Sequence, residues 1–208
     1  GDWSSEVCYS DILELDPKFI TAYYNRGVVH SNMKNIDKAI SDYDKAIELE
    51  PKYPNAYYNR GILKSDKNDI NGAISDYSEA IKLKPDFAMA YYNRGLCMNK
   101  KNELDKAISD FNKVIQLKPD FAIAYSDRGG AKEAKNDLNG AIADYNEAIK
   151  LEPQSFYAYN NRGNLYKKAG MLNEALADLN KAISLESEKA LIYFKIGRAH
   201  VWTPVTEY

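Results

Sequence analysis

The chain has 208 residues, with 28 Lys and Arg against 30 Asp and Glu and a net charge of −2. This balance argues against a general nucleic-acid binder, which needs an excess of cations to neutralise phosphates. The mean hydropathy is −0.56, and the sequence holds no apolar run of about 18 residues, so we expect no membrane span. The aromatic composition is unusual, because 17 Tyr accompany only 6 Phe and 2 Trp.

Cysteine and histidine are scarce. Cys8 and Cys97 lie far apart, without the spacing of a disulfide framework or a zinc site. We therefore expect no metal and no cofactor. Two reduced thiols are typical of a cytoplasmic protein, which is the location we expect, and a nuclear location is the alternative.

A repeat of 34 residues organises the chain. The string AYYNRG at 22–27 recurs at 56–61 and 90–95, and in altered form at 124–129 and 158–163. A proline closes each unit, at Pro17, Pro51, Pro85, Pro119 and Pro153, and Ser187 takes its place in the last. This register predicts a partial repeat with only a second helix (1–19), five complete repeats (20–189), the start of a sixth (190–197) and a non-repeat tail (198–208).

The C-terminal tail does not follow the repeat pattern. Ile196–Thr206 reads IGRAHVWTPVT, which is similar to a translated sequencing adapter. We interpret residues 198–208 as an adapter-derived artefact and exclude them from functional reasoning. On this interpretation the terminal repeats lack caps, and self-association through the uncapped ends is one of the expected behaviours.

Each unit is predicted to fold as two helices, because its apolar residues recur at helical spacing. Residues that tolerate a left-handed backbone separate the two, at Asn68, Asn102, Asn136 and Gly170, with Lys34 in the first unit. Asn35, Asp69 and Asp137 follow and supply acceptors for the next helix N-terminus. Gly27 and Ala39, with their counterparts, let the two helices approach closely.

The period, the Tyr23–Gly27 spacing, Ala39, Tyr43, Ala46 and Pro51 together resemble the tetratricopeptide repeat. The resemblance implies an all-α fold, an α-solenoid in which 34-residue helix-turn-helix repeats form a right-handed superhelix. Two columns depart from the family pattern. Tyr replaces the usual Trp at Tyr23 and its counterparts, and Arg replaces the usual Leu just before the Gly.

The Arg column has candidate partners. Every repeat carries one Arg (Arg26, Arg60, Arg94, Arg128, Arg162) and one Asp (Asp42, Asp76, Asp110, Asp144, Asp178). We predict an Arg–Asp ladder between the two helices, within a repeat or across to its neighbour. The alternative is that the Arg stem packs while its charged head stays in water.

The resemblance also implies a site, because partners of this family usually bind in the concave groove lined by first helices. Carried over by position, the groove residues are Tyr24, Asn25, Val28, Tyr58, Asn59, Ile62, Tyr92, Asn93, Leu96 and Asn161. Asn offers a donor and an acceptor to the backbone of an extended peptide, and Tyr offers a rigid apolar body with a polar tip. The alternative is that the Asn side chains bond neighbouring helices and the Tyr rings fill the packing between repeats.

Two sharper functions are not supported by the sequence. Co-chaperones of this family that bind the acidic tails of heat-shock proteins use a two-carboxylate clamp. When the clamp is aligned with the first three complete repeats, two of the positions that need a cation hold Tyr24 and Met89. No plausible Ser-His-Asp set, phosphate loop or metal spacing indicates an enzyme, and His30 lies where side chains normally pack between helices.

We therefore predict a non-enzymatic protein-interaction scaffold that binds a peptide or partner protein in the groove, without nucleic acid or membrane. Two alternatives stay open. One is the substrate-recruitment region of a larger enzyme, such as an O-linked N-acetylglucosamine transferase-like protein, whose asparagine ladder the Asn column resembles. The other is an architectural array that associates with itself.

Overall fold

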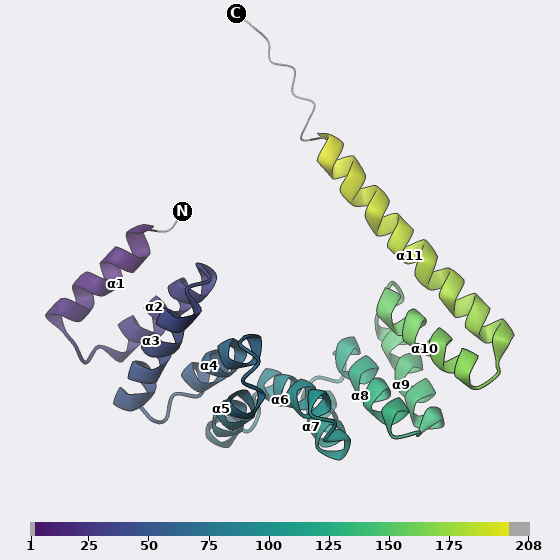
Figure 1. Ribbon diagram of the computed structural model, residues 1–208, viewed down its shortest axis with the longest axis horizontal. Helices are drawn as coiled ribbons and strands as arrows, with labels where there is room; N and C mark the ends of the chain where they lie inside the picture. Colours follow the sequence, from purple (N-terminus) through teal and green to yellow (C-terminus); the bar gives the residue numbers. More distant parts are fainter. Residues whose placement is uncertain (1–2, 200–208) are drawn as a thin grey trace, which may run out of the picture. The chain divides into compact units, whose positions relative to one another are not determined.

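The structure is a computed structural model that describes the backbone of residues 3–199 and the side chains of residues 9–187 (Figure 1). Within these residues the fold is all-α, with eleven helices and no strand. The helices are α1 Trp3–Leu15, α2 Ile20–Asn32, α3 Ile36–Leu49, α4 Pro54–Asp66, α5 Ile70–Leu83, α6 Ala88–Lys100, α7 Leu104–Leu117, α8 Ala122–Ala134, α9 Leu138–Leu151, α10 Phe156–Lys168 and α11 Leu172–Ala199.

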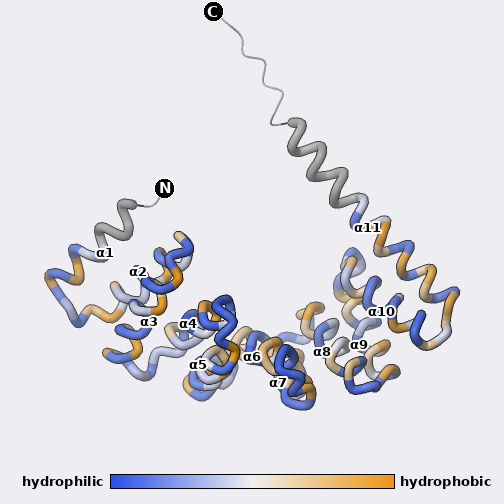
Figure 2. Tube along the Cα trace, in the orientation of Figure 1, coloured by the Kyte–Doolittle hydropathy of each residue, from blue (hydrophilic) through white to orange (hydrophobic). Residues whose placement is uncertain are grey.

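The chain forms two compact units, residues 1–118 with α1 to α7 and residues 119–208 with α8 to α11. In the first unit, α2 packs on α3, α4 on α5 and α6 on α7, and consecutive hairpins contact each other through α3–α4 and α5–α6. Helix α1 packs on α2. In the second unit, α8 pairs with α9 and α10 with α11, and α9 contacts α10. Helices α2 to α10 each mix hydrophobic and hydrophilic residues along their length (Figure 2), as expected where one stripe is buried.

The turn inside each hairpin has the left-handed backbone that the sequence predicts. The φ angles are 62° at Lys34, 64° at Asn68, 61° at Asn102, 64° at Asn136 and 77° at Gly170. Asp69 and Asp137 then cap the second helices by accepting hydrogen bonds from the backbone N–H of Gly72 and Gly140, at 3.0 and 2.9 Å. Asn35 makes no such side-chain cap.

In the first four complete hairpins a glycine of the first helix lies close to an aromatic ring of the second, whereas in the fifth Gly163 faces Leu179. A Cβ placed on Gly27 would lie 2.8 Å from Cε1 of Tyr43, and one on Gly61 would lie 2.8 Å from Cε1 of Tyr77. The rings are almost fully enclosed, because Tyr43, Tyr77 and Tyr145 are each only 1% exposed. The recurring spacing of 16 residues therefore places a bulky second-helix ring against a first-helix residue that has no side chain.

An Arg–Asp ladder forms, and each pair lies within one repeat. The guanidinium Nε and Nη2 of each Arg donate to the two oxygens of the Asp in its own hairpin, at 2.6 to 3.0 Å. The five Asp residues are only 3 to 6% exposed. Such fork-to-carboxylate pairs combine charge with fixed geometry, so the ladder sets the angle at which the two helices of a repeat meet.

The same guanidinium groups also contact a tyrosine ring of their own helix, and two of them bond a side chain of the preceding repeat. Each lies 5.5 to 5.7 Å from the ring centroid of the Tyr three residues earlier, in the pairs Tyr23–Arg26, Tyr57–Arg60, Tyr91–Arg94, Tyr125–Arg128 and Tyr159–Arg162. Nη1 of Arg60 donates to Asp44 at 2.6 Å, and Nη1 of Arg94 donates to Ser78 at 3.0 Å. Because Asp44 and Ser78 belong to the preceding repeat, each of these Arg residues joins two repeats.

Helix α11 does not stop where the other second helices stop. It continues without a break from Leu172 to Ala199, through the position of Ser187 and the segment predicted to begin a sixth repeat. Proline cannot continue a helix, whereas serine can, so the missing proline removes the signal that ends α3 or α5. Three apolar side chains of this helix are largely exposed, at 66% for Leu172, 61% for Leu176 and 62% for Ile183. Residues 200–208 of the predicted tail lie outside the described part.

The ladder predicts unequal costs for two Arg variants. In the described structure Arg94 is the only cation bonded to Asp110, whereas Asp76 has both Arg60 and Lys64, whose Nζ lies 2.8 Å from Oδ2. Arg94→Met should therefore lower the free energy of unfolding by about 3 kcal/mol, because it leaves a buried carboxylate unpaired, and Arg60→Met should cost clearly less. Urea unfolding measures both. The double variant Arg94→Met, Asp110→Leu should recover most of the loss, and equal costs for the two single variants would contradict the account.

Two adjacent glycines of α8 provide a matched test of the close approach. A Cβ on Gly129 would lie 2.9 Å from Cε1 of Tyr145, whereas a Cβ on Gly130 would meet only the Tyr145 hydroxyl at 3.7 Å. Gly130→Ala should stabilise the protein by about 1 kcal/mol through helix propensity. Gly129→Ala should lower the melting temperature, because the buried ring has to shift. Stabilisation by both substitutions would rule out the proposed role of the glycine column.

Candidate functional site

The predicted groove residues lie on first helices of both units. Tyr24, Asn25 and Val28 belong to α2, whereas Tyr58, Asn59 and Ile62 belong to α4, and Tyr92, Asn93 and Leu96 belong to α6. Asn161 belongs to α10 in the second unit. All ten are half-buried except Leu96, which is 36% exposed.

Tyrosine and asparagine side chains of successive repeats are bonded to each other. Nδ2 of Asn59 donates to the hydroxyl of Tyr24 at 3.1 Å, and Nδ2 of Asn93 donates to the hydroxyl of Tyr58 at 3.1 Å. Each link spans from one first helix to the next. Asn59 and Asn93 therefore bond a neighbouring helix, which is the alternative to a free peptide-binding role that the sequence left open.

The tyrosine rings also take part in the packing between repeats. The Tyr24 ring centroid lies 5.9 Å from that of Tyr43 and 4.9 Å from that of Tyr53. Tyr58 makes the equivalent contacts with Tyr77 at 5.9 Å and Phe87 at 4.7 Å. The Tyr24 and Tyr58 rings therefore pack against aromatic rings of the second helix and of the segment before the next repeat. The link to the tyrosine hydroxyl uses only one of the two amide hydrogens of each Asn.

Three of the predicted residues meet at a pocket in the first unit, which we call the first hollow. Val28, Asn59 and Ile62 line it together with Ser31, Asn32 and Tyr43, and its volume is about 160 Å³. Burial raises the pKa of Tyr43 to about 12, so its hydroxyl is neutral at pH 7. The hollow therefore combines two aliphatic side chains with uncharged donors and acceptors.

The second unit contains a pocket in the equivalent register, which we call the second hollow. Its volume is about 560 Å³, and it is lined by Glu133, Asn161, Asn164, Lys167 and Lys168. Glu133, Asn161 and Asn164 occur three repeat lengths after Ser31, Asn59 and Ile62. The pocket between successive first helices is thus lined by apolar and uncharged polar side chains in the first unit, and it includes charged side chains in the second.

Sequence reasoning missed the parts of the hollows that come from outside the Tyr–Asn–aliphatic columns. Ser31 and Asn32 lie one turn after Val28 on the same helix face, so helical spacing was an available signal for them. Tyr43 is the buried ring of the first hairpin, and it also lines the first hollow. The sequence contained no pattern that marks Glu133 as a pocket residue, because the equivalent position in the first repeat holds the uncharged Ser31.

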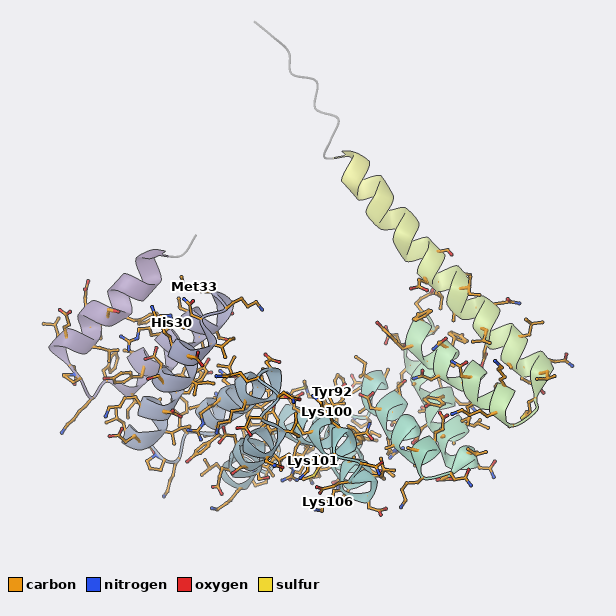
Figure 3. All side chains as sticks on the ribbon, viewed as in Figure 1. His30, Met33, Tyr92, Lys100, Lys101 and Lys106 are labelled. Atoms are coloured by element: carbon orange, nitrogen blue, oxygen red, sulfur yellow. The ribbon has the colours of Figure 1, made fainter. Side chains whose placement is uncertain are left out.

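A third pocket gathers residue types that catalysis uses. It has a volume of about 340 Å³ and is lined by Ser10, Arg26, His30, Lys38, Ser41 and Asp42. His30, labelled in Figure 3, is only 4% exposed, and its Nε2 lies 3.7 Å from Oδ2 of Asp42. That distance exceeds hydrogen-bond reach, and the Asp42 oxygens accept from Arg26 instead. A catalytic triad needs the carboxylate to orient the imidazole, so this geometry favours a structural role.

No group of three or more His, Cys, Asp or Glu side chains in the range 9–187 is arranged to hold a metal ion. None of the helices in the described part of the chain is both long and apolar enough to cross a membrane.

The Tyr–Asn links predict different roles for two asparagines of the same column. Asn59→Ala should lower the free energy of unfolding by about 1 kcal/mol, because the half-buried hydroxyl of Tyr24 loses its donor. Asn161 has Ser126 at the place of Tyr24, so Asn161→Ala should leave stability unchanged or slightly raised. Urea unfolding of the two variants measures the difference. An equal loss in both would show that the tyrosine link contributes nothing.

Comparison with known proteins agrees with this architecture. Family models described as tetratricopeptide repeat match residues 20–53, 88–121, 156–189 and 42–75, and one described as TPR repeat matches 64–101 and 132–170. No curated protein matches the chain.

Solved structures share the fold. MamA is 27% identical, with a TM-score of 0.76 over 79% of this chain and 96% of MamA. YrrB, described as a TPR protein with an unusual peptide-binding site, is 21% identical, with a TM-score of 0.75 over 91% of this chain and 97% of YrrB. PilF from Pseudomonas aeruginosa is 16% identical, with a TM-score of 0.71 over 79% of this chain and 75% of PilF. The chain belongs to the tetratricopeptide repeat family.

Proposed function

We propose that this protein is an interaction scaffold that binds an extended segment of a partner protein along the face of its first helices. Side chains of the partner enter the hollows between successive first helices, and the Asn column hydrogen-bonds its backbone. The observation that carries the proposal is the first hollow, where Val28, Asn59 and Ile62 converge.

The chemistry of the first hollow suits one side chain of modest size. Its volume is about 160 Å³, and Val28 and Ile62 supply apolar contact. Asn59 donates to Tyr24 through Nδ2, which leaves its carbonyl oxygen as an acceptor for a backbone N–H of the partner. The preformed Tyr–Asn links hold this acceptor in place before binding, which reduces the entropy lost on association.

The family to which the chain belongs supports the role of an interaction scaffold. Tetratricopeptide repeats are generally non-catalytic scaffolds, and YrrB is described as having a peptide-binding site. Recruitment for a larger enzyme, self-association and a cytoplasmic location stay predictions from the sequence.

A screen of the full chain against overlapping peptides on an array tests the proposal. Binding peptides should then lose about tenfold in affinity, or ~1.4 kcal/mol, to a Ser31→Gln variant, because the longer side chain fills the first hollow. Ser75→Gln, on the exposed face of α5, is the matched control and should bind as the wild type does. Urea midpoints verify that both variants fold. An array without binders, or binders indifferent to Ser31→Gln, would overturn the proposal.

A further inference from the structure

Helix α11 presents a line of apolar side chains that we call the apolar row. Its members are Leu172, Leu176, Leu179 and Ile183, which follow each other at spacings of four, three and four. This spacing places them along one stripe of the helix. Leu179 is half-buried, whereas the other three are 61 to 66% exposed.

In earlier repeats the next first helix covers the equivalent positions. Ile36 and Ile40 of α3 pack against a buried cluster that contains Leu63 of α4. They stand four repeat lengths before Leu172 and Leu176. These two leucines therefore occupy places that are designed for contact with another helix.

The last member of the apolar row has a covered counterpart as well. Ile81 of α5 lies in a cluster with Ala90 of α6 and is only 9% exposed. It stands three repeat lengths before Ile183. The apolar row is thus one half of an interface between repeats.

Helix α11 does not fold back to cover its own row. To do so, the chain would have to turn where the proline is missing, but the helix continues unbroken to Ala199 (Figure 1). Helix α11 packs on α10, and in the described part of the chain no further helix follows it. The row is therefore open to another molecule.

We propose that the apolar row binds the same row of a second copy of this chain, in an antiparallel pair of α11 helices. Spacings of four, three and four read the same in both directions. A twofold axis between Leu176 and Leu179 therefore places Leu172 of one copy opposite Ile183 of the other. It also places Leu176 opposite Leu179, so each apolar residue meets an apolar residue. Alternating spacings of three and four form the seam of paired helices, and a twofold interface needs such a self-complementary surface.

The residues beside the row favour a second copy over a charged partner. Asn173, Asn180 and Ser187 border the row on its exposed side, and all three are uncharged. At about 100° per residue, Glu174 and Lys181 project from the opposite side of the helix. Two copies can therefore approach without like charges along the border.

A charge at the end of the row selects the antiparallel direction. Glu186 comes three residues after Ile183, so it occupies the next place of the same spacing, and it is exposed. In a parallel pair the two Glu186 side chains would face each other, and such like-charge contacts are costly. In the antiparallel pair, the axis places Glu186 level with the turn between α10 and α11 of the other copy.

Sedimentation equilibrium of the full chain, from micromolar to millimolar concentration, tests the proposal. The 23.6 kDa chain should form a dimer that dissociates on dilution. Ile183→Glu should weaken dimerisation at least about tenfold, because both copies then bring a charge into the apolar contact. Ile123→Glu, at an exposed isoleucine of α8, is the matched control and should dimerise as the wild type does. Urea midpoints verify that both variants fold.

Three results would overturn the proposal. A chain that stays monomeric at all concentrations would leave the apolar row to a different protein. A dimer that is indifferent to Ile183→Glu would use another surface. A series of ever larger species would indicate a head-to-tail contact, which does not close.

A pair of double variants tests the antiparallel direction. With the proposed axis, Asn173 of one copy lies beside Asn180 of the other, whereas in a parallel pair the two levels are about 10 Å apart. Asn173→Lys with Asn180→Glu should therefore dimerise more tightly than Asn173→Lys with Asn180→Lys, by about tenfold. High NaCl should reduce this difference, because the contacts are exposed to solvent. Equal dimer affinities at low salt would rule out the antiparallel pair.

Discussion

The buried Arg–Asp pair is the constraint on which the rest of each repeat depends. A carboxylate as enclosed as Asp76 requires a cation, and Arg60 reaches it with two parallel bonds of 2.6 and 2.8 Å. Such bonds form only if the two helices lie close together, and the adjacent Gly61 permits that approach because the Tyr77 ring occupies the space of a side chain. Charge pairing and ring packing therefore specify the same helix–helix geometry from neighbouring residues.

That geometry in turn shapes the face where binding is proposed. With the helices of a repeat set by the ladder, consecutive first helices lie at a distance that lets Asn59 reach Tyr24 and Asn93 reach Tyr58. The hollows occupy the remaining space between them. Their chemistry is then free to differ, since it depends on residues such as Ser31 and Glu133 that take no part in the ladder.

Much of the fold followed from the sequence because repetition multiplies weak signals. The left-handed turn at Asn68, the cap at Asp69 and the pairing of Arg60 with Asp76 each recur at a fixed spacing. The site was less accessible, because a column of residues does not show which neighbour it contacts. The donation from Asn59 to Tyr24 joins residues 35 positions apart, and only the coordinates choose between that link and a free groove. The helix Leu172–Ala199 shows the opposite limit, because it runs without a break across residue 189, where the register places the end of the fifth repeat.

The bond that a guanidinium makes to the preceding repeat contributes to the coupling between neighbouring repeats. In repeat proteins, stability is approximately a sum of terms within repeats and terms between nearest neighbours. In the first unit the inter-repeat contact is ionic for Arg60 with Asp44 at 2.6 Å, neutral for Arg94 with Ser78 at 3.0 Å, and long for Arg26 with Ser10 at 3.5 Å. Unfolding of the first complete repeat away from the second therefore has to break an ion pair between Arg60 and Asp44 as well as the contacts between helices α3 and α4.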